Sequence, residues 1–450
     1  MPLNPNRPTP GQPREYHFPP FSHRTLDNGL TVWAVPLPGR AVVSVSLVVD
    51  GGAATETEAQ GGVAALAAQS LVTGTQRLDA NDFAIASERL GIEIGADSAW
   101  DSARAGFSAL GARLEEGLGL LGEMVRQPRF DDEEFTRLRE ERLADIMQAR
   151  SEPGRLADEQ YLAQLFGSDS PYGRLSAGTP ETVEPLTVSD ARAHHARTWG
   201  PAGGHLVLAG PVEIERAFRL AEKEFGSWTG GGAGHRSFAV EREPRRRVVL
   251  YDRPGSVQSE IRVGEIGIAR TDPNYFPAVV MAGVLGGTFS SRLNQRLREE
   301  LGYTYGARAG FDPRRSRGPM VSRAAVQTEV SAASVTELLA VLEGMRAAPP
   351  ADGELADVRD YMVGVFPLRF ETTGGVAGAI EPIAVYELAT DWWATYRDRI
   401  ESVTPEHVHD SARELIHPDS ALILLVGDAA TVEPALVEAG LGPIEVISAD

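Results

Sequence analysis

The chain has 450 residues, too many for one ordinary hydrophobic core, which predicts two to four domains. Its composition, 42% hydrophobic and 24% charged, is that of a globular protein. The formal net charge of −20 argues against a nucleic-acid partner, because contacts to phosphates need clustered lysine and arginine. No cysteine is present, so disulfides and cysteine metal sites are excluded.

The first twenty residues, rich in proline and polar side chains, predict an extended N-terminal arm over 1–20. They contain no apolar run typical of a signal peptide. No stretch of the chain approaches the roughly 18 continuous apolar residues of a membrane span. We therefore expect a cytoplasmic protein without a membrane span, and a periplasmic one if a leader has been removed.

Periodicity in the first half alternates between the two-residue repeat of strands and the longer repeat of helices. The predicted elements, in chain order, are strands 30–36 and 42–50, helices 62–72 and 81–90, strands 92–96 and 103–108, and helices 112–126 and 132–150.

The order of elements near the middle of the chain returns near its C-terminus. Thr187 precedes a helix and a strand that ends at Gly210, 23 residues later, and Thr404 stands the same 23 residues before Gly427. A repeat of about 200 residues predicts two homologous α+β halves, each a mixed or antiparallel sheet with helices packed on one face.

A glycine-rich stretch at 228–234 separates the two copies and is typical of a flexible linker. It suggests an N-terminal domain over 21–228, a linker over 229–246 and a C-terminal domain over 247–450. A connection of this kind would let the two halves hinge.

A segment of the second half combines a helix signal with a strand signal. Leu293, Leu297 and Leu301 recur every four residues, as on one face of a helix. Gly302 follows the last of them, where helices commonly stop, and alternation then predicts a strand over 303–311.

Two side chains of this segment could converge on one point, although a surface arginine and a half-buried tyrosine are the simpler interpretation of any isolated pair. Arg298 lies beside the leucine stripe near the helix end, and Tyr305 follows seven residues later at the predicted strand start. Upstream, the glycine-rich stretch 283–290 allows backbone to approach a ligand closely. Its residues at the candidate substrate-binding site are Gly286, Gly287, Thr288 and Phe289.

Taken together, these segments resemble the pitrilysin-like (M16, M16B-type) metallopeptidase family. The likeness is to its small two-repeat members, which include the mitochondrial processing peptidase and bacterial relatives. It runs from about Phe21 to about Ile447. Its markers are the stretches 28–32, 51–52, 62–75, 170–174, 180–183 and 290–305.

In catalytic members of that family, the helix after the glycine pair carries His-x-x-Glu-His, in which both histidines bind zinc and the glutamate activates water. The resemblance places Ala65 and Gln69 at the histidine positions and Ala68 at the glutamate position. Asp145 stands where the last ligand would be. Alanine supplies no ligand and glutamine is a poor one for zinc. We therefore expect no metal and no other cofactor in this chain.

The nine histidines do not repair this loss, because none stands four residues from another, the spacing that shares one helix face. We interpret them as ordinary surface histidines: His17, His23, His194, His195, His205, His235, His407, His409 and His417.

The family's second functional element is an arginine and a tyrosine seven residues apart, which Arg298 and Tyr305 match. The resemblance implies that Tyr305 stabilises the oxyanion of the scissile carbonyl and that Arg298 holds a peptide carbonyl. It implies a subunit that is inactive alone and forms a heterodimer with a zinc-bearing M16 homologue carrying His-x-x-Glu-His. The dimer would enclose unfolded peptide substrates.

Two alternatives remain open from the sequence. One is a catalytically inert scaffold, like the core subunits of respiratory complexes, and the other is a homodimeric peptide-binding protein. Retention of both Arg298 and Tyr305 favours the peptidase subunit, because a scaffold has no need of the pair.

Overall fold

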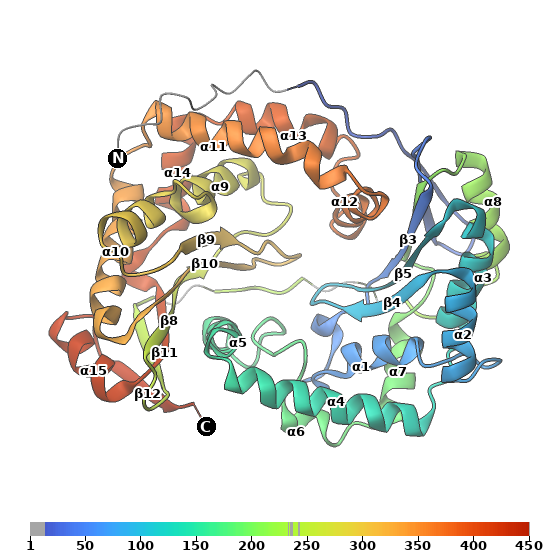
Figure 1. Ribbon diagram of the computed structural model, residues 1–450, viewed down its shortest axis with the longest axis horizontal. Helices are drawn as coiled ribbons and strands as arrows, with labels where there is room; N and C mark the ends of the chain where they lie inside the picture. The colour runs from blue at the N-terminus through green and yellow to red at the C-terminus, as the bar shows by residue number, and fades with distance from the viewer. Residues whose placement is uncertain (1–13, 233, 235–236, 242–243, 450) are drawn as a thin grey trace.

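The computed structural model describes residues 14–232, 234, 237–241 and 244–449. In these ranges the chain forms two six-stranded sheets, one at either side of the molecule, with helices around them (Figure 1). This confirms the predicted class of two similar halves, each with a mixed sheet.

The N-terminal sheet has the strand order β1-β2-β6-β3-β5-β4. Only β2 and β6 run parallel, and the other neighbours are antiparallel. Its strands are β1 (Ser22–Thr25), β2 (Thr31–Pro36), β3 (Val42–Val49), β4 (Glu93–Ser98), β5 (Ala103–Leu110) and β6 (His205–Gly210).

The C-terminal sheet has the order β12-β7-β11-β8-β10-β9. Its strands are β7 (Arg247–Asp252), β8 (Gln258–Ile266), β9 (Ala307–Phe311), β10 (Pro319–Gln327), β11 (Leu422–Gly427) and β12 (Ile444–Ser448). In places and directions, the strands β7, β11, β8, β10 and β9 repeat β2, β6, β3, β5 and β4. The sixth strand differs, because β12 runs parallel to β7 whereas β1 runs antiparallel to β2.

The internal repeat predicted from the spacing is therefore present in the fold. Thr187 and Thr404 each begin a helix with a capping box. In it, the threonine side chain and the side chain three residues later each accept a hydrogen bond from the other residue's backbone N–H. The strand that follows ends at Gly210 in one copy and at Gly427 in the other.

The helices of the N-terminal half are α1 (Val63–Leu71), α2 (Ala80–Leu90), α3 (Leu114–Arg126), α4 (Asp132–Ser151), α5 (Pro153–Phe166), α6 (Pro180–Val183), α7 (Val188–Thr198) and α8 (Ile214–Phe225). Those of the C-terminal half are α9 (Tyr275–Ala282), α10 (Ser331–Ala347), α11 (Asp352–Val365), α12 (Thr373–Val385), α13 (Trp392–Glu401), α14 (Pro405–Leu415) and α15 (Ala429–Glu438). Within the described ranges, none is both long and apolar enough to cross a membrane.

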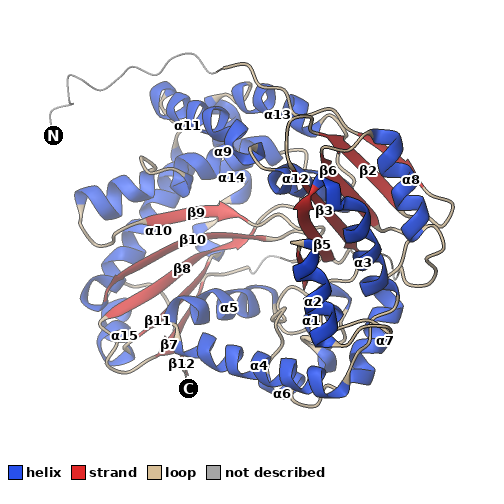
Figure 2. Cartoon of the chain, turned by 45° about the vertical axis from the view of Figure 1, so that its right-hand side comes forward, coloured by secondary structure: helices blue, strands red, loops and turns tan. Residues whose placement is uncertain are grey.

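Each sheet packs helices of its own half on one face and a helix of the other half on the opposite face. Val32 and Ala34 of β2 join the core under α1, α3 and α8, whereas Trp33 and Val35 join the core that contains α12. In the C-terminal sheet, Val249 packs instead with residues of α5. Figure 2 shows α5 beside the C-terminal sheet and α12 against the N-terminal one. This exchange of helices was not predicted from the sequence.

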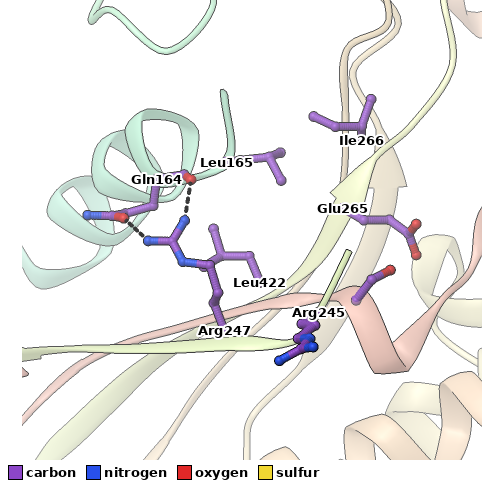
Figure 3. A pocket seen from close by; sticks show the side chains of 8 residues that line it. Gln164, Leu165, Arg245, Arg247, Glu265, Ile266 and Leu422 are labelled. Atoms are coloured by element: carbon purple, nitrogen blue, oxygen red, sulfur yellow. Dashed lines mark hydrogen bonds between the residues drawn. The ribbon is translucent and has the colours of Figure 1, made fainter. Parts of the chain in front are cut away.

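Hydrogen bonds fix α5 to the sheet that it covers. The guanidinium of Arg247, at the start of β7, donates to the side-chain oxygen of Gln164 at 2.8 Å and to its carbonyl at 3.3 Å (Figure 3). The hydroxyl of Tyr161 donates to the carbonyl of Met320 on β10 at 2.9 Å. Helix α5 is thus part of the C-terminal layer although it belongs to the N-terminal half of the sequence.

The turn after β4 and the equivalent turn after β9 meet between the sheets in a polar cluster, here named the inter-sheet clasp (Asp50, Asp101, Tyr172, Arg315, Tyr386). Asp101 accepts from the hydroxyls of Tyr172 at 2.7 Å and Tyr386 at 3.2 Å and from the backbone N–H of Arg315 at 2.9 Å. The Arg315 guanidinium donates to Asp50 at 3.2 Å. Burial, followed by the charge of Asp101, raises the pKa of both tyrosines, so they remain neutral donors.

Over its described part, the predicted arm has no helix or strand, and it contacts the other half of the chain. Tyr16 stacks on Phe370, with ring centroids 6.0 Å apart, and Phe18 meets Phe370 and Trp393 at 5.0 and 6.4 Å. The arm, the exchanged helices and the inter-sheet clasp all tie the halves together. These contacts oppose the hinge motion that the glycine-rich stretch suggested.

Candidate functional site

The leucine-striped segment is helical, but most of it is a π-helix, η5 (Asn294–Glu300). The N–H of Leu301 donates to the carbonyl of Arg296, five residues back. Leu293 and Leu297 are fully buried, as the spacing predicts, and Gly302 follows with φ +67°. Another π-helical turn, η4 (Gly283–Gly287), lies just upstream. Such turns are frequent at functional sites.

Two of the three arginines in this segment anchor it to neighbouring helices. Arg292 makes a paired contact with Glu354 of α11 at 2.7 and 2.9 Å, and Arg296 does the same with Glu337 of α10 at 2.7 and 3.0 Å. Hydrogen bonding to Arg296 lowers the pKa of Glu337, so this carboxylate is charged. Bidentate pairs of this kind fix orientation as well as position.

The third arginine, Arg298, is held differently. Its guanidinium lies 4.3 Å from the centre of the Phe289 ring, a cation–π contact, and 3.6 Å from Glu299. The aromatic face orients the guanidinium while leaving its N–H donors available for a ligand.

Tyr305 lies in a loop rather than at the start of a strand. The strand expected from residue 303 begins only at Ala307, because Thr304 makes a local turn instead. The hydroxyl of Thr304 donates to the Ala325 carbonyl at 2.8 Å and accepts from the N–H of Gly306 at 3.2 Å. The side chain of Tyr305 is 96% exposed.

Asn294 joins the parts of the site, and sequence reasoning missed it. It is only 7% exposed, and its side-chain oxygen accepts from the N–H of Ala307 at 2.9 Å. Its amide donates to the carbonyl of Thr288 at 3.1 Å and to the hydroxyl of Ser291 at 3.2 Å. The one signal in the sequence is its position a single helical turn before Arg298.

These elements enclose a cavity of about 680 Å³. Arg298, Tyr305 and the predicted substrate-binding residues Gly286, Gly287, Thr288 and Phe289 all line it, together with Asn294, Arg308, Asp357 and Tyr361. Gly286 packs so closely on the backbone of Ala309 that any Cβ there would clash. The sequence thus located the lining from 286 to 305, but not the contribution of α11.

We expect Asn294→Ala to destabilise the fold by about 1–3 kcal/mol, the usual cost of leaving buried hydrogen-bonding groups unpaired. The Ala307 N–H and the Thr288 carbonyl would both lose their partner. Denaturant unfolding monitored by circular dichroism measures this loss. The adjacent Gln295 is exposed, so Gln295→Ala is the matched control. Equal stability of the two variants would contradict the role assigned to Asn294.

The residues at the former zinc positions do not fit a zinc ion. Ala65 and Ala68 are buried and aliphatic on α1, and Gln69 is half-buried on the same helix. On α4, the carboxylate of Asp145 faces Arg142 at 3.6 Å and Arg155 at 3.4 Å. Over the described parts of the chain, no group of three or more histidine, aspartate or glutamate side chains is arranged to hold a metal.

A buried carboxylate does lie at the start of α1, where it caps the helix. Glu56 accepts from the N–H groups of Gly62 at 3.1 Å and Ala64 at 2.7 Å. Burial raises its pKa to about 7, and these two bonds and the nearby Arg174 oppose that shift. The Glu56 carboxyl group therefore serves to cap the backbone of α1.

Three histidines that we expected at the surface lie inside the fold instead: His194 is buried, and His195 and His205 are half-buried. His194, 2% exposed, has Nε2 3.2 Å from the Gly51 carbonyl, and His195 has Nε2 2.9 Å from the Val125 carbonyl. His205 accepts from the indole N–H of Trp33 at 3.3 Å. Burial lowers the pKa of each to about 4, so all three are neutral packing residues at pH 7. His235 lies outside the described residues.

Comparison with known proteins gives the same picture along most of the chain. A family model described as "Insulinase (Peptidase family M16)" matches residues 32–176, and one described as "Peptidase M16 inactive domain" matches residues 185–362. The non-peptidase homolog YmxG of Helicobacter pylori is 24% identical over 373 residues, 81% of this chain and 84% of that protein. An uncharacterized zinc protease of Mycobacterium tuberculosis is 26% identical over 400 residues, 87% of this chain and 90% of that protein.

Among solved structures, the crystal structure of a peptidase M16 inactive domain from Pseudomonas fluorescens superimposes with a TM-score of 0.84 at 24% identity. It covers 91% of this chain and 98% of that one, so the whole two-sheet fold is shared. The two family models, the repeated sheets and the altered zinc helix agree, and the chain belongs to the M16 peptidase family.

Proposed function

We propose that this chain is the non-zinc-binding subunit of a heterodimeric M16-type zinc peptidase, and that it supplies Arg298 and Tyr305 for substrate binding and transition-state stabilisation. The observation that carries this proposal is their convergence. They come from a π-helix and from a loop, yet both line one cavity beside the glycine-rich stretch.

The two side chains divide the work by their chemistry. The phenolic O–H of Tyr305 donates a hydrogen bond to the scissile carbonyl oxygen, and this bond strengthens as negative charge develops there. The guanidinium of Arg298, oriented by Phe289, donates to a carbonyl of the peptide backbone. The partner, a homologue with His-x-x-Glu-His, supplies the zinc that activates the attacking water.

The exposure of Tyr305 explains why a partner is required. In open solvent, a hydroxyl as exposed as that of Tyr305 competes with water for every acceptor, so it contributes little. Docking of a second subunit over the cavity, with an unfolded peptide between them, removes that water. The same hydrogen bonds are then made in a medium of lower dielectric, where they are stronger.

Mixing the purified chain with an M16 homologue that carries His-x-x-Glu-His tests the proposal. We expect hydrolysis of an unfolded fluorogenic peptide by the mixture and none by this chain alone. A partner whose motif glutamate is changed to glutamine is the control, and its mixture should be inactive. A partner that hydrolyses the peptide equally well without this chain would contradict the proposal.

A second candidate is a catalytically inert scaffold. The relative named a non-peptidase homolog and the match to a model described as an inactive domain favour it. A stable complex with the zinc-bearing homologue that never hydrolyses peptide would support this reading. A self-dimer that binds peptide would support a homodimeric binding protein instead.

A further inference from the structure

A second hollow, here named the sheet-face pocket, adjoins the cavity that Arg298 and Tyr305 line. Its volume is about 320 Å³, and the turn after β4, the helix α5 and the hairpin of β9 and β10 enclose it. Arg323 on its wall is the cross-strand partner of Arg308, which lines the larger cavity, so the two hollows lie side by side. The apolar residues of the sheet-face pocket are Trp100, Leu162, Gly310, Phe311, Pro319 and Val321.

The floor of this pocket is the face of β9 at Gly310. Apart from its neighbours in sequence, no atom of the described chain lies within 4 Å of the position that a Cβ would take there. Val321, the cross-strand partner of Gly310, lies on the same face and packs with Tyr161 and Leu162 of α5. Helix α5 thus covers the sheet as far as β10 and leaves the face of β9 open at Gly310.

The charged groups at the rim of the pocket are already paired with one another. Arg323 lies 3.6 Å from Asp158, and their side chains are 45% and 47% exposed, so the pocket opens to solvent here. Arg314 donates to Asp312 at 2.7 and 2.9 Å, and its guanidinium lies 3.7 Å from the centre of the Trp100 ring. Because each charge has a partner, a charged ligand gains little in this pocket, and the surface left for binding is apolar.

We propose that the sheet-face pocket binds one large apolar side chain, such as phenylalanine or leucine, of the peptide substrate. Its volume of about 320 Å³ lies at the lower end of the range for ligand pockets, roughly 300 Å³, which suits a single side chain. Packing of that side chain against Leu162 and Val321 removes apolar surface from water on both sides. The ligand is taken to be part of the substrate, so this inference rests on the proposed function.

The location favours a peptide substrate over a side chain of the partner subunit. Trp100 comes from the N-terminal half and Gly310 from the C-terminal half, and Figure 1 shows α5 facing β9 and β10 near the middle of the molecule. Gly310 follows Tyr305 by five residues, so their Cα atoms are at most about 18 Å apart. A peptide whose scissile carbonyl lies at Tyr305 therefore reaches the pocket with about five extended residues.

Fluorescence anisotropy with this chain alone tests the proposal. The probes are unfolded peptides of one sequence that carry phenylalanine, leucine, alanine or glutamate at a single central position. We expect the phenylalanine and leucine peptides to bind about 10-fold more tightly than the alanine peptide, because the pocket takes a large apolar side chain out of water. Glutamate should bring no gain over alanine.

Gly310→Ile fills the pocket from its floor, and the phenylalanine and alanine peptides should then bind equally. The φ of Gly310 lies outside the left-handed region and isoleucine suits a strand, so we expect an unchanged or higher melting temperature. Gly310→Ala adds one methyl group and should lower the preference in part. Gly95→Ile is the matched control and should keep the full preference. Gly95 is exposed on β4, the equivalent outer strand of the N-terminal sheet, and has the same open space beside it.

A phenylalanine preference that survives Gly310→Ile overturns the proposal, and so does equal binding of the phenylalanine and alanine peptides by the unchanged chain. If Gly310→Ile instead weakens association with the zinc-bearing homologue and leaves the peptide preference intact, the pocket serves the partner and the proposal fails. Peptide binding is measured without the zinc partner, so its outcome is independent of hydrolysis in the mixture.

Discussion

Replacing Tyr305 by phenylalanine is expected to lower turnover by the assembled peptidase about 10²- to 10³-fold, the usual loss for one donor to a developing oxyanion. The change removes a single hydroxyl. Because the side chain is 96% exposed, the fold loses no packing, and the phenyl ring keeps the shape of the cavity wall. We expect the two subunits to associate as before.

Steady-state kinetics of the mixture, with subunit association followed by analytical ultracentrifugation, measures the effect. The loss should fall on kcat and kcat/KM together, because the bond forms only in the transition state. Tyr361, the other tyrosine of the cavity, is 53% exposed, so Tyr361→Phe is the matched control and should leave kcat unchanged. An unchanged kcat for Tyr305→Phe would remove this hydroxyl from the mechanism.

Much of the fold could be predicted because local patterns determine it. The alternation after residue 42 and the apolar run from 422 to 426 identify central strands, which are buried along their length. Thr187 and Thr404 begin equivalent helices because a threonine with a suitable side chain three residues later satisfies the first backbone donors. The same order of elements and the equal 23-residue spacing from each threonine to the glycine that ends the next strand predicted the repeat.

What could not be predicted depends on contacts distant in sequence or on details below the level of periodicity. The helices α5 and α12 were not among the predicted elements, and no local pattern says which sheet a helix will cover. The four-residue spacing of the leucines fits an α-helix, and nothing in it specifies bonds to the fifth residue back. Asn294 is a polar residue among charged neighbours, and its burial follows only from the tertiary fold.

The division into domains at the glycine-rich stretch remains a proposal, and the exchanged helices change what it means. A domain boundary at 229–246 separates the two sheets. It assigns α5 to the N-terminal domain, although α5 packs against the C-terminal sheet. Motion of one half against the other would have to remove α5 and α12 from both cores. The structure therefore does not favour hinge motion within the chain.

The strength of that connection can be measured at Arg315, and we expect Arg315→Ala to lower the free energy of unfolding by about 3–5 kcal/mol, the cost of breaking a buried ion pair by removing one partner. The side chains of Arg315 and Asp50 are only 10% and 13% exposed. The guanidinium also donates to the Val385 carbonyl at 2.6 Å, at the end of α12. The substitution therefore removes the ion pair of the Asp50 carboxylate with Arg315 and one donor to the Val385 carbonyl where the sheets meet.

Chemical denaturation with matched m-values measures the loss. Arg317→Ala is the control from the same turn, because its guanidinium bonds to the Gly267 carbonyl within its own half and not across the inter-sheet clasp. Asp50→Ala combined with Arg315→Ala should cost clearly less than the two single changes summed, because both single changes remove the same ion pair. Additive losses, or equal losses for Arg315→Ala and Arg317→Ala, would show that the inter-sheet clasp does not hold the halves together.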